Sequence, residues 1–306
     1  MIDLDKNIRY VVAFSGGADS ALLAFLMQQE GYDIRLVHVI HPDSAASNSG
    51  EQLANFCPLW AEKYSLNISC LRVEPSLETL KSKGTEAAER EVRYNALFSS
   101  LFLDEALVTG HHLDDSIETF FFRLARGTSV KGLSGISPGS NQSRLFRPLL
   151  SLSKKKILQL VESAAILYGH DSTNDDTKLS RSFIRNKIIP LFVEHFSAEK
   201  FYPSMGRAME NMAECAELME DLYNIDIQSC ATNATEIDRG IFCKLSVARQ
   251  QNLLYHFMSK NFGLFLTKSA INEIQKRLNS KKTIDQFTVS GIRFTIDKWM
   301  LRCQIP

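Results

Sequence analysis

The most chemically specific segment of the chain is Ser15-Gly16-Gly17-Ala18-Asp19-Ser20, which stands where a short apolar run gives way to a helical pattern. Two glycines let the backbone approach an anion closely, and the amides at a helix N-terminus carry a partial positive charge. The serine hydroxyls add hydrogen-bond donors. The segment is not a Walker A loop, because the G-x-x-x-x-G-K-[ST] pattern is absent and no lysine follows. It predicts a phosphate-binding loop, with a glycine-rich turn that only opens a helix as the alternative.

Asp19 lies inside this loop, where a carboxylate would repel a bare phosphate. A carboxylate is useful there if it holds Mg²⁺ against phosphate oxygens. We therefore expect the loop to bind a nucleotide together with Mg²⁺.

A second polar segment, Thr109 to Thr119, also follows an apolar run and opens a helical pattern. Asp115 and Glu118 are three residues apart and would share one helix face, which suits a cationic amine. The segment also holds His111 and His112 beside two aspartates, so a metal-dependent phosphohydrolase site stays open as an alternative.

The elements around these segments alternate between strand and helix, which favours βαβ units and a parallel sheet covered on both faces. Such sheets bind ligands at the carboxyl ends of their strands. The expected strands are 10–14, 34–40, 68–73 and 106–109, and the expected helices are 21–29, 52–64, 86–103 and 117–126. Further helices are expected at 153–165, at 183–192 with Pro190 closing it, and at 205–223. A small α+β unit follows, with helices at 247–261 and 268–279 and strands at 286–290, 291–297 and 300–304.

The composition is that of an ordinary globular protein, with 306 residues, 44% of them hydrophobic, and a length that favours two domains. No apolar run approaches the ~18 residues that span a bilayer, and no signal peptide is evident, so we expect a cytoplasmic protein without membrane contact. The six cysteines form no C-x-x-C pair, which excludes a zinc knuckle and a redox dithiol. They are expected to be reduced and mostly buried.

The formal net charge is zero, but the charges are unevenly distributed. Residues 1–200 carry 22 basic and 24 acidic side chains, residues 201–238 carry 1 and 8, and residues 239–306 carry 12 and 3. We therefore expect a catalytic domain over 1–200, an acidic helical linker over 201–238 and a basic α+β domain over 239–306. A compact basic segment is typical of a module that binds nucleic-acid phosphates, with a solvated basic face as the alternative.

The S-G-G-x-D-S loop after a strand resembles that of the N-type ATP pyrophosphatases, or PP-loop enzymes, which split ATP between its α- and β-phosphates. Over a longer stretch the chain is similar to the tRNA(Ile)-lysidine synthetase family. The resemblance is carried by Glu86 to Tyr94, Arg126-Gly127-Thr128, Arg147-Pro148-Leu149, Asp171 to Asn174 and Arg181 to Pro190. The chain departs from the family at Ile40, at Pro42-Asp43-Ser44 and at Ser116, where the family usually has Asn, a Gly-Leu-Arg run and Gln.

The resemblance implies a Rossmann-like PP-loop ATPase domain followed by a helical linker and a small tRNA-contacting domain. It implies a ligase that uses ATP and Mg²⁺ to join free L-lysine to the cytidine at the first anticodon position of an isoleucine tRNA, through an adenylated tRNA. On this basis Ser15 to Ser20 and His111 would bind ATP, and Asp19 would hold the metal. Asp115 and Glu118 would bind the lysine amine, and Arg185 would stabilise charge at the adenylated base. Candidate tRNA contacts are Arg90, Arg185, Lys281 and Lys282.

Three alternatives stay open beside this interpretation. A tRNA cytidine thiolase shares the ATP loop, but its chemistry generally uses paired cysteines, which the chain lacks. A nucleotide-sensing module without catalysis would explain the loop but not Asp115 with Glu118. The third alternative is the phosphohydrolase. The sequence leaves a homodimer open.

Overall fold

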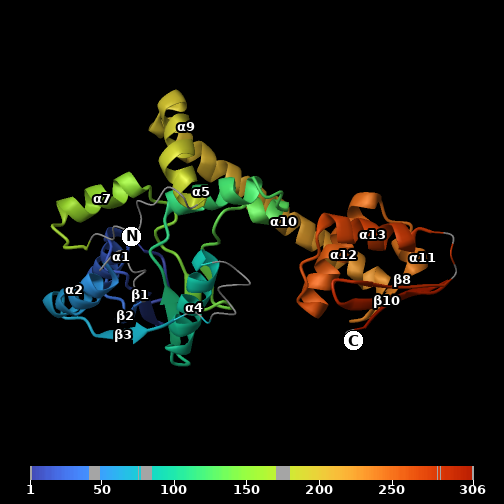
Figure 1. The fold of residues 1–306 in the computed structure, drawn as a ribbon, viewed down its shortest axis with the longest axis horizontal. Helices are drawn as coiled ribbons and strands as arrows, with labels where there is room; N and C mark the ends of the chain where they lie inside the picture. The colour runs from blue at the N-terminus through green and yellow to red at the C-terminus, as the bar shows by residue number, and fades with distance from the viewer. Residues whose placement is uncertain are drawn as a thin grey trace. The chain divides into compact units, whose positions relative to one another are not determined.

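The structure is a computed structural model that describes residues 2–40, 49–74, 76, 85–169, 180–280, 282 and 284–304. The chain divides into two compact units, Met1–Asn211 and Met212–Pro306 (Figure 1). No helix among the described residues is long and apolar enough to cross a membrane.

The first unit is built on a six-stranded sheet in the order β3-β2-β1-β4-β6-β5. All neighbouring strands are parallel except β5 and β6, which are antiparallel. The expected parallel sheet is therefore confirmed, but the sequence analysis missed its two short last strands, which have only two residues each. The strands are β1 (Arg9–Ala13), β2 (Ile34–Ile40), β3 (Ile68–Arg72), β4 (Glu105–Val108), β5 (Gly139–Ser140) and β6 (Leu145–Phe146).

The helices of the first unit lie close to the expected ranges, with one correction. We expected Pro190 to close a helix, but it lies in the first turn of α9, which continues to Phe196. The chain passes from the π-helix η2 into α9 without leaving helical geometry, since Ile188 and Ile189 both have right-handed helical φ and ψ, so Pro190 does not end the helix. The helices are α1 (Ala18–Gln29), α2 (Ser49–Lys63), α4 (Thr85–Ser99), α5 (Leu113–Leu124), α6 (Val130–Leu133), α7 (Lys154–Ser163), α8 (Ser180–Phe183), the π-helix η2 (Ile184–Ile188) and α9 (Ile189–Phe196).

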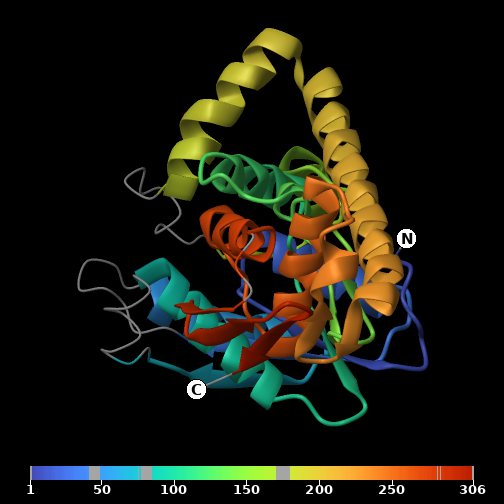
Figure 2. The ribbon, with the colours of Figure 1, turned by 90° about the vertical axis from the view of Figure 1, so that its right-hand side faces the viewer.

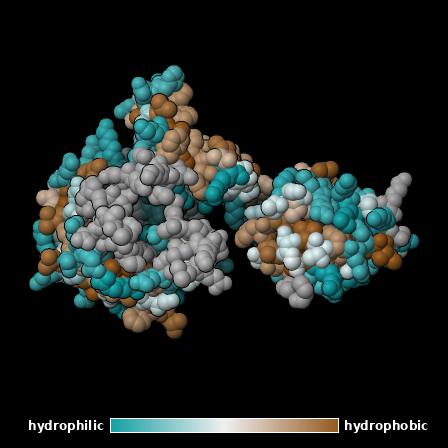
Figure 3. All heavy atoms as spheres, viewed as in Figure 1, coloured by the Kyte–Doolittle hydropathy of each residue, from teal (hydrophilic) through white to brown (hydrophobic). Residues whose placement is uncertain are grey.

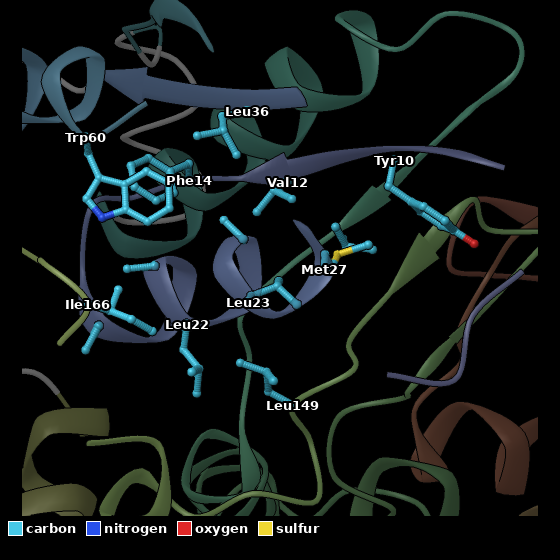
Figure 4. Close-up of a cluster of buried hydrophobic side chains, with 14 of the residues drawn as sticks. Tyr10, Val12, Phe14, Leu22, Leu23, Met27, Leu36, Trp60, Leu149 and Ile166 are labelled. Atoms are coloured by element: carbon cyan, nitrogen blue, oxygen red, sulfur yellow. The ribbon is translucent and has the colours of Figure 1, made fainter. Parts of the chain in front are cut away.

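The core of this unit lies on both faces of β1, as a parallel sheet requires. Tyr10 and Val12 pack on the face towards α1, together with Leu22 and Met27 from that helix (Figure 4). Val11 points to the opposite face, where it belongs to a separate apolar cluster. Burial on both faces fixes the end of β1, from which the glycine-rich loop starts.

A helical hairpin follows the sheet region. The chain reverses at Ser197, which has a φ of 63°, between α9 and the long helix α10 (Ala198–Cys230) (Figure 2). Leu191 and Phe196 on α9 are more than half exposed, and hydrophobic residues lie at the surface of this helical hairpin (Figure 3).

The second unit is an α+β fold with an antiparallel sheet in the order β7-β8-β11-β10-β9. Its buried residues include Tyr223 of α10, Phe257 and Phe294, so the last turns of α10 belong to its core. Residues 231–238, which we assigned to the acidic linker, form two strands of this sheet. Its elements after α10 are β7 (Ala231–Asn233), β8 (Glu236–Asp238), α11 (Arg239–Phe242), α12 (Val247–Phe262), α13 (Lys268–Leu278), β9 (Asp285–Val289), β10 (Ile292–Ile296) and β11 (Met300–Gln304).

All six cysteines are free, but only half of them are buried. Cys57, Cys230 and Cys303 are buried, whereas Cys70, Cys215 and Cys243 are exposed. The expectation of mostly buried thiols was therefore too strong.

Candidate active site

The glycine-rich loop after β1 has the geometry expected of an anion-binding turn. Gly16 has a φ of +85°, a conformation that side chains other than glycine rarely adopt. The Ser20 hydroxyl accepts a hydrogen bond from the Ser15 amide at 3.2 Å and donates one to the Gly17 carbonyl at 3.0 Å, which closes the loop into a ring. Gly17 precedes α1 without a side-chain cap, so the first amides of that helix are left for a ligand.

Gly110 brings the second polar segment into direct contact with this loop. A Cβ at Gly110 would lie 3.0 to 3.1 Å from backbone atoms of Asp19 and Ser20, closer than side chains normally approach. The two segments meet because they follow β1 and β4, which are neighbours in the sheet. The chain leaves β1 towards β2 on one side and returns as β4 on the other. This reversal of strand order is where open α/β sheets bind ligands.

His112 lies between three carboxylates at this junction. Its Nε2 is 3.8 Å from Asp19 Oδ1 and 3.5 Å from Asp115 Oδ2, and its Nδ1 is 3.6 Å from Asp114 Oδ2. Burial disfavours a charged imidazole, but the three carboxylates outweigh it and raise the pKa of His112 above its usual value. The three carboxylates around His112 thus favour its protonated form, a role that the sequence analysis did not assign.

Lys154 is the second cation of this group. Its Nζ is 2.6 Å from Asp19 Oδ1, although 135 residues separate the two in the chain. Asp114 holds Lys154 in place, because its Oδ2 accepts a hydrogen bond from the Lys154 backbone amide at 2.8 Å. The hydroxyl of Tyr202 on α10 donates to Asp114 Oδ1 at 2.8 Å.

Sequence reasoning missed Lys154, Asp114 and Tyr202. A signal was present for Lys154, since three consecutive lysines open α7. Positive charge at a helix N-terminus is unfavourable because of the helix dipole, so a run of lysines there indicates a role other than helix stability.

Arg185 lies between the two carboxylates that we assigned to the lysine amine. Its Nε is 2.5 Å from Glu118 Oε1 and its Nη2 is 3.1 Å from Glu118 Oε2, while Nη2 is 3.6 Å from Asp115 Oδ1. Burial raises the pKa of Glu118, whose side chain is 2% exposed, although Arg185 opposes that shift. Arg185 stands on η2, and π-helical turns are frequent at functional sites. The structure thus brings Asp115, Glu118 and Arg185 together.

His111 faces a different environment from its neighbour His112. Its Nδ1 is 2.8 Å from the hydroxyl of Thr109. Burial, followed by the positive charges of Arg90 and Arg147, lowers the pKa of His111 to about 3. His111 is therefore a neutral imidazole at pH 7, and Arg90 lies near enough to influence it.

The remaining sequence-based candidates belong to the second unit or lie outside the described residues. Lys282 is exposed in the second unit, where its carbonyl accepts a hydrogen bond from Arg239 at 2.9 Å. Lys281, Pro42 to Ser44 and Asp171 to Asn174 lie outside the described residues.

Ser116, where the chain departs from the family, is buried on α5. Its hydroxyl accepts a hydrogen bond from the Ile136 amide at 2.8 Å and ties α5 to the following loop. A Cβ at Gly135 would come within 2.4 Å of that hydroxyl, so the space around Ser116 is already filled.

The described residues contain no group of three or more His, Cys, Asp or Glu side chains that could hold a metal ion. Asp19 nevertheless fits Mg²⁺, because this ion is commonly held by one or two carboxylates plus substrate phosphates. A single carboxylate is compatible with an ion whose other ligands come from phosphates and water, and the described side chains do not form a metal centre by themselves.

Comparisons with known proteins agree with this geometry. A family model described as a PP-loop domain matches residues 2–192. The chain is 31% identical over 254 residues to a tRNA(Ile)-lysidine synthase of Actinobacillus pleuropneumoniae, covering 82% of this chain and 58% of that protein. It is 29% identical over 303 residues to a tRNA(Ile)-lysidine synthase of Nitrosomonas europaea, covering 96% of this chain and 63% of that protein.

The fold has counterparts among solved structures. The U34-tRNA thiolase NcsA from Methanococcus maripaludis, solved with its [4Fe-4S] cluster, matches with a TM-score of 0.51 and 17% identity over 68% of this chain and 72% of that one. This likeness concerns the fold alone. The chain spans about three fifths of the lysidine synthases that it matches. A complete glycine loop at the strand-order reversal, together with the family match over residues 2–192, shows that the chain belongs to the PP-loop family of ATP-utilising domains.

Proposed function

We propose that this protein is a tRNA(Ile)-lysidine synthase, which ligates free L-lysine to the cytidine at the first anticodon position of the isoleucine tRNA with a CAU anticodon. The observation that carries the proposal is the group formed by Asp19, Asp115, Glu118 and Arg185 at the edge of the PP-loop. It combines a phosphate-binding turn with a carboxylate pair suited to an amine. The names of the relatives support the same reaction.

In the first step of the proposed reaction, the 2-keto oxygen of the cytosine attacks the α-phosphorus of ATP and pyrophosphate leaves. The amides of the loop from Ser15 to Ser20 hold the departing phosphates. Asp19 would hold Mg²⁺, which would offset negative charge at the phosphates. Arg185 is placed to stabilise charge at the adenylated base.

In the second step the ε-amine of lysine attacks the activated carbon of the base, and AMP leaves. Asp115, 21% exposed, is the more accessible carboxylate and binds the incoming ammonium, whereas Glu118, 2% exposed, orients Arg185. One carboxylate takes up the proton that the amine must lose before it attacks.

The proposal includes the partners that this reaction needs. These are isoleucine tRNA, free lysine, ATP and Mg²⁺, in the cytoplasm, where tRNA is processed. We also propose that the first unit is the catalytic domain and that the second unit, Met212–Pro306, which includes residues 231–238 of the expected linker, contacts the tRNA.

The decisive test is to incubate the protein with tRNA transcripts, Mg²⁺-ATP and each radiolabelled amino acid in turn. Label should enter the isoleucine tRNA with lysine alone, with one AMP and one pyrophosphate released for each lysine. Release of phosphate from ATP or a phosphoester without label in the RNA would reject the proposal in favour of a hydrolase. Transfer of sulfur to the tRNA would favour a thiolase.

A further inference from the structure

We propose that Lys154 binds the phosphates of the nucleoside triphosphate. In the absence of the nucleotide and its metal, the Lys154 ammonium group pairs instead with Asp19. The PP-loop itself carries no lysine, unlike a Walker A loop. The fold supplies an ammonium group from α7 at 2.6 Å from the carboxylate in the loop. This inference rests on the nucleotide site of the proposed function and not on the identity of the amino acid or the tRNA.

The position of Lys154 is fixed from its backbone side. Its amide donates to Asp114 at 2.8 Å, and the side chain of Ser153 caps the same helix end. Asp114 is itself held by the Tyr202 hydroxyl. The first turn of α7 is therefore anchored independently of the ammonium group, whose own contact with Asp19 can be exchanged without loss of the helix.

The ion pair between Lys154 and Asp19 has the exposure expected of an exchangeable contact. The side chains are 38% and 30% exposed, and pairs at such exposure contribute little to folding stability. Two further lysines follow at the start of α7, where positive charge is unfavourable for the helix. The pairing with Asp19 is therefore a weak structural reason for a lysine at position 154, whereas a polyanionic ligand explains it.

The negative charge of Asp19 can be neutralised by only one of two partners, Lys154 or a metal ion. Asp19 can either pair with Lys154 or hold Mg²⁺ bound to phosphate oxygens, because a carboxylate occupied by an ammonium group is a poor metal ligand. When Asp19 turns to the metal, the Lys154 ammonium is left beside the phosphates, where it can make charge-assisted hydrogen bonds. No bond is made or broken covalently in this exchange.

The first arm of the test measures nucleotide binding without turnover. The Lys154→Met variant should bind Mg²⁺ with α,β-methylene-ATP at least tenfold more weakly than the wild type, by titration calorimetry in the absence of tRNA and lysine. Lys156→Met is the matched control, since it removes an exposed lysine from the same helix turn and should leave the affinity unchanged. Lys154→Arg should retain most of the binding. Equal affinity of Lys154→Met and wild type would overturn the inference.

The second arm separates phosphate binding from a purely structural pairing. In EDTA, Asp19→Asn should tighten binding of the metal-free analogue at least threefold, because it frees Lys154 and removes a repelling carboxylate. Adding Lys154→Met to the Asp19→Asn variant should lower the affinity by a larger factor than Lys154→Met lowers it in the wild type. Independent effects of the two substitutions would reject the exchange, even if Lys154→Met proved unstable alone.

These arms are independent of the ligation assay. If the wild type attaches no lysine to tRNA but Lys154→Met still weakens nucleotide binding, the proposed function fails while the inference stands. If lysine is attached and Lys154→Met binds the nucleotide normally, the inference about Lys154 fails while the proposed function stands.

Discussion

The two units of the chain use their charged side chains in opposite ways. In the first unit, the buried His112 lies among three carboxylates and the partly exposed Lys154 pairs with one of them, near the ends of β1 and β4. In the second unit, charged side chains pair with one another across the fold. Arg239, which is buried, donates to four backbone carbonyls, those of Leu278, Ser280, Lys282 and Asp297.

The charge contrast that the sequence shows between 201–238 and 239–306 is largely cancelled inside the second unit. Arg249 pairs with the buried Asp226 of α10, and Lys260 is 2.7 Å from Glu220 on the same helix. Residues 212–306 carry 12 basic and 10 acidic side chains, so the unit as folded is nearly balanced. A run of charge in the sequence is therefore weaker evidence for RNA binding than a partly exposed, convergent group such as the one around Asp19.

The largest effect is expected at Asp19. The Asp19→Asn variant should fold, because the side chain is 30% exposed and packs little, yet lose turnover of Mg²⁺-ATP by two orders of magnitude or more. The measurement is pyrophosphate release with tRNA and lysine present. Asp33→Asn is the control and should be active, because it removes only the exposed ion pair with Arg9 at the amino ends of β1 and β2. Near-normal turnover of a folded Asp19→Asn protein would remove the metal role.

The next effect is expected at the carboxylate pair. Glu118→Gln should raise the lysine KM or slow the second step by roughly tenfold to a hundredfold, the range expected for a lost charge-assisted hydrogen bond of about 1.5–3 kcal/mol. Adenylation of the tRNA, followed by radiolabel from α-labelled ATP, should be slowed as well, because Glu118 orients Arg185. Glu162→Gln on the exposed side of α7 is the control. An unchanged dependence on lysine would assign Glu118 to structure alone.

A smaller effect is expected from the pH dependence of stability. The folded pKa of His111 is lowered to about 3, so the unfolded chain binds a proton there more readily than the folded one. Its contribution to stability is present above about pH 6.5 and decreases as the pH falls, by at most about 1.4 kcal/mol per pH unit. His112, with its raised pKa, acts in the opposite direction, so its contribution is present below about pH 6.5 and is lost as the pH rises.

The variant His111→Gln separates these two contributions. Its melting temperature should fall less than that of the wild type between pH 6.5 and 5, whereas the difference should be small between pH 7 and 8. Parallel curves over the whole range would show that His111 is not the group responsible.

The smallest effect is expected in the second unit, and it tests the comparison directly. Charge reversal at Lys281 and Lys282 should weaken tRNA binding and make the log–log salt slope shallower by roughly 0.7 to 0.9 for each phosphate that the protein no longer neutralises. Arg249→Gln should lower thermal stability and leave the slope unchanged, because that side chain pairs with Asp226. A slope that changes with Arg249 and not with the two lysines would reverse our view of which charges face the RNA.

The sequence by itself determined the long strands and helices and the positions of the glycine-rich loop and the second polar segment, but not the short elements β5 to β8, α6 and α11. Local patterns suffice for these features, because a buried strand, a double glycine and a helix start are each encoded within a few neighbouring residues. The resemblance to a known family then assigned roles to Asp19, Asp115, Glu118 and Arg185.

Only the tertiary structure decided which cations meet these carboxylates. Lys154 reaches Asp19 across 135 residues, and Arg185 reaches Glu118 across 67, because α7 and η2 are packed near the ends of β1 and β4. The same holds for the second unit, where pairing across the fold cancels a charge contrast that is obvious along the chain. Electrostatic interactions depend on distance in space and on burial, and neither can be read from separation in sequence.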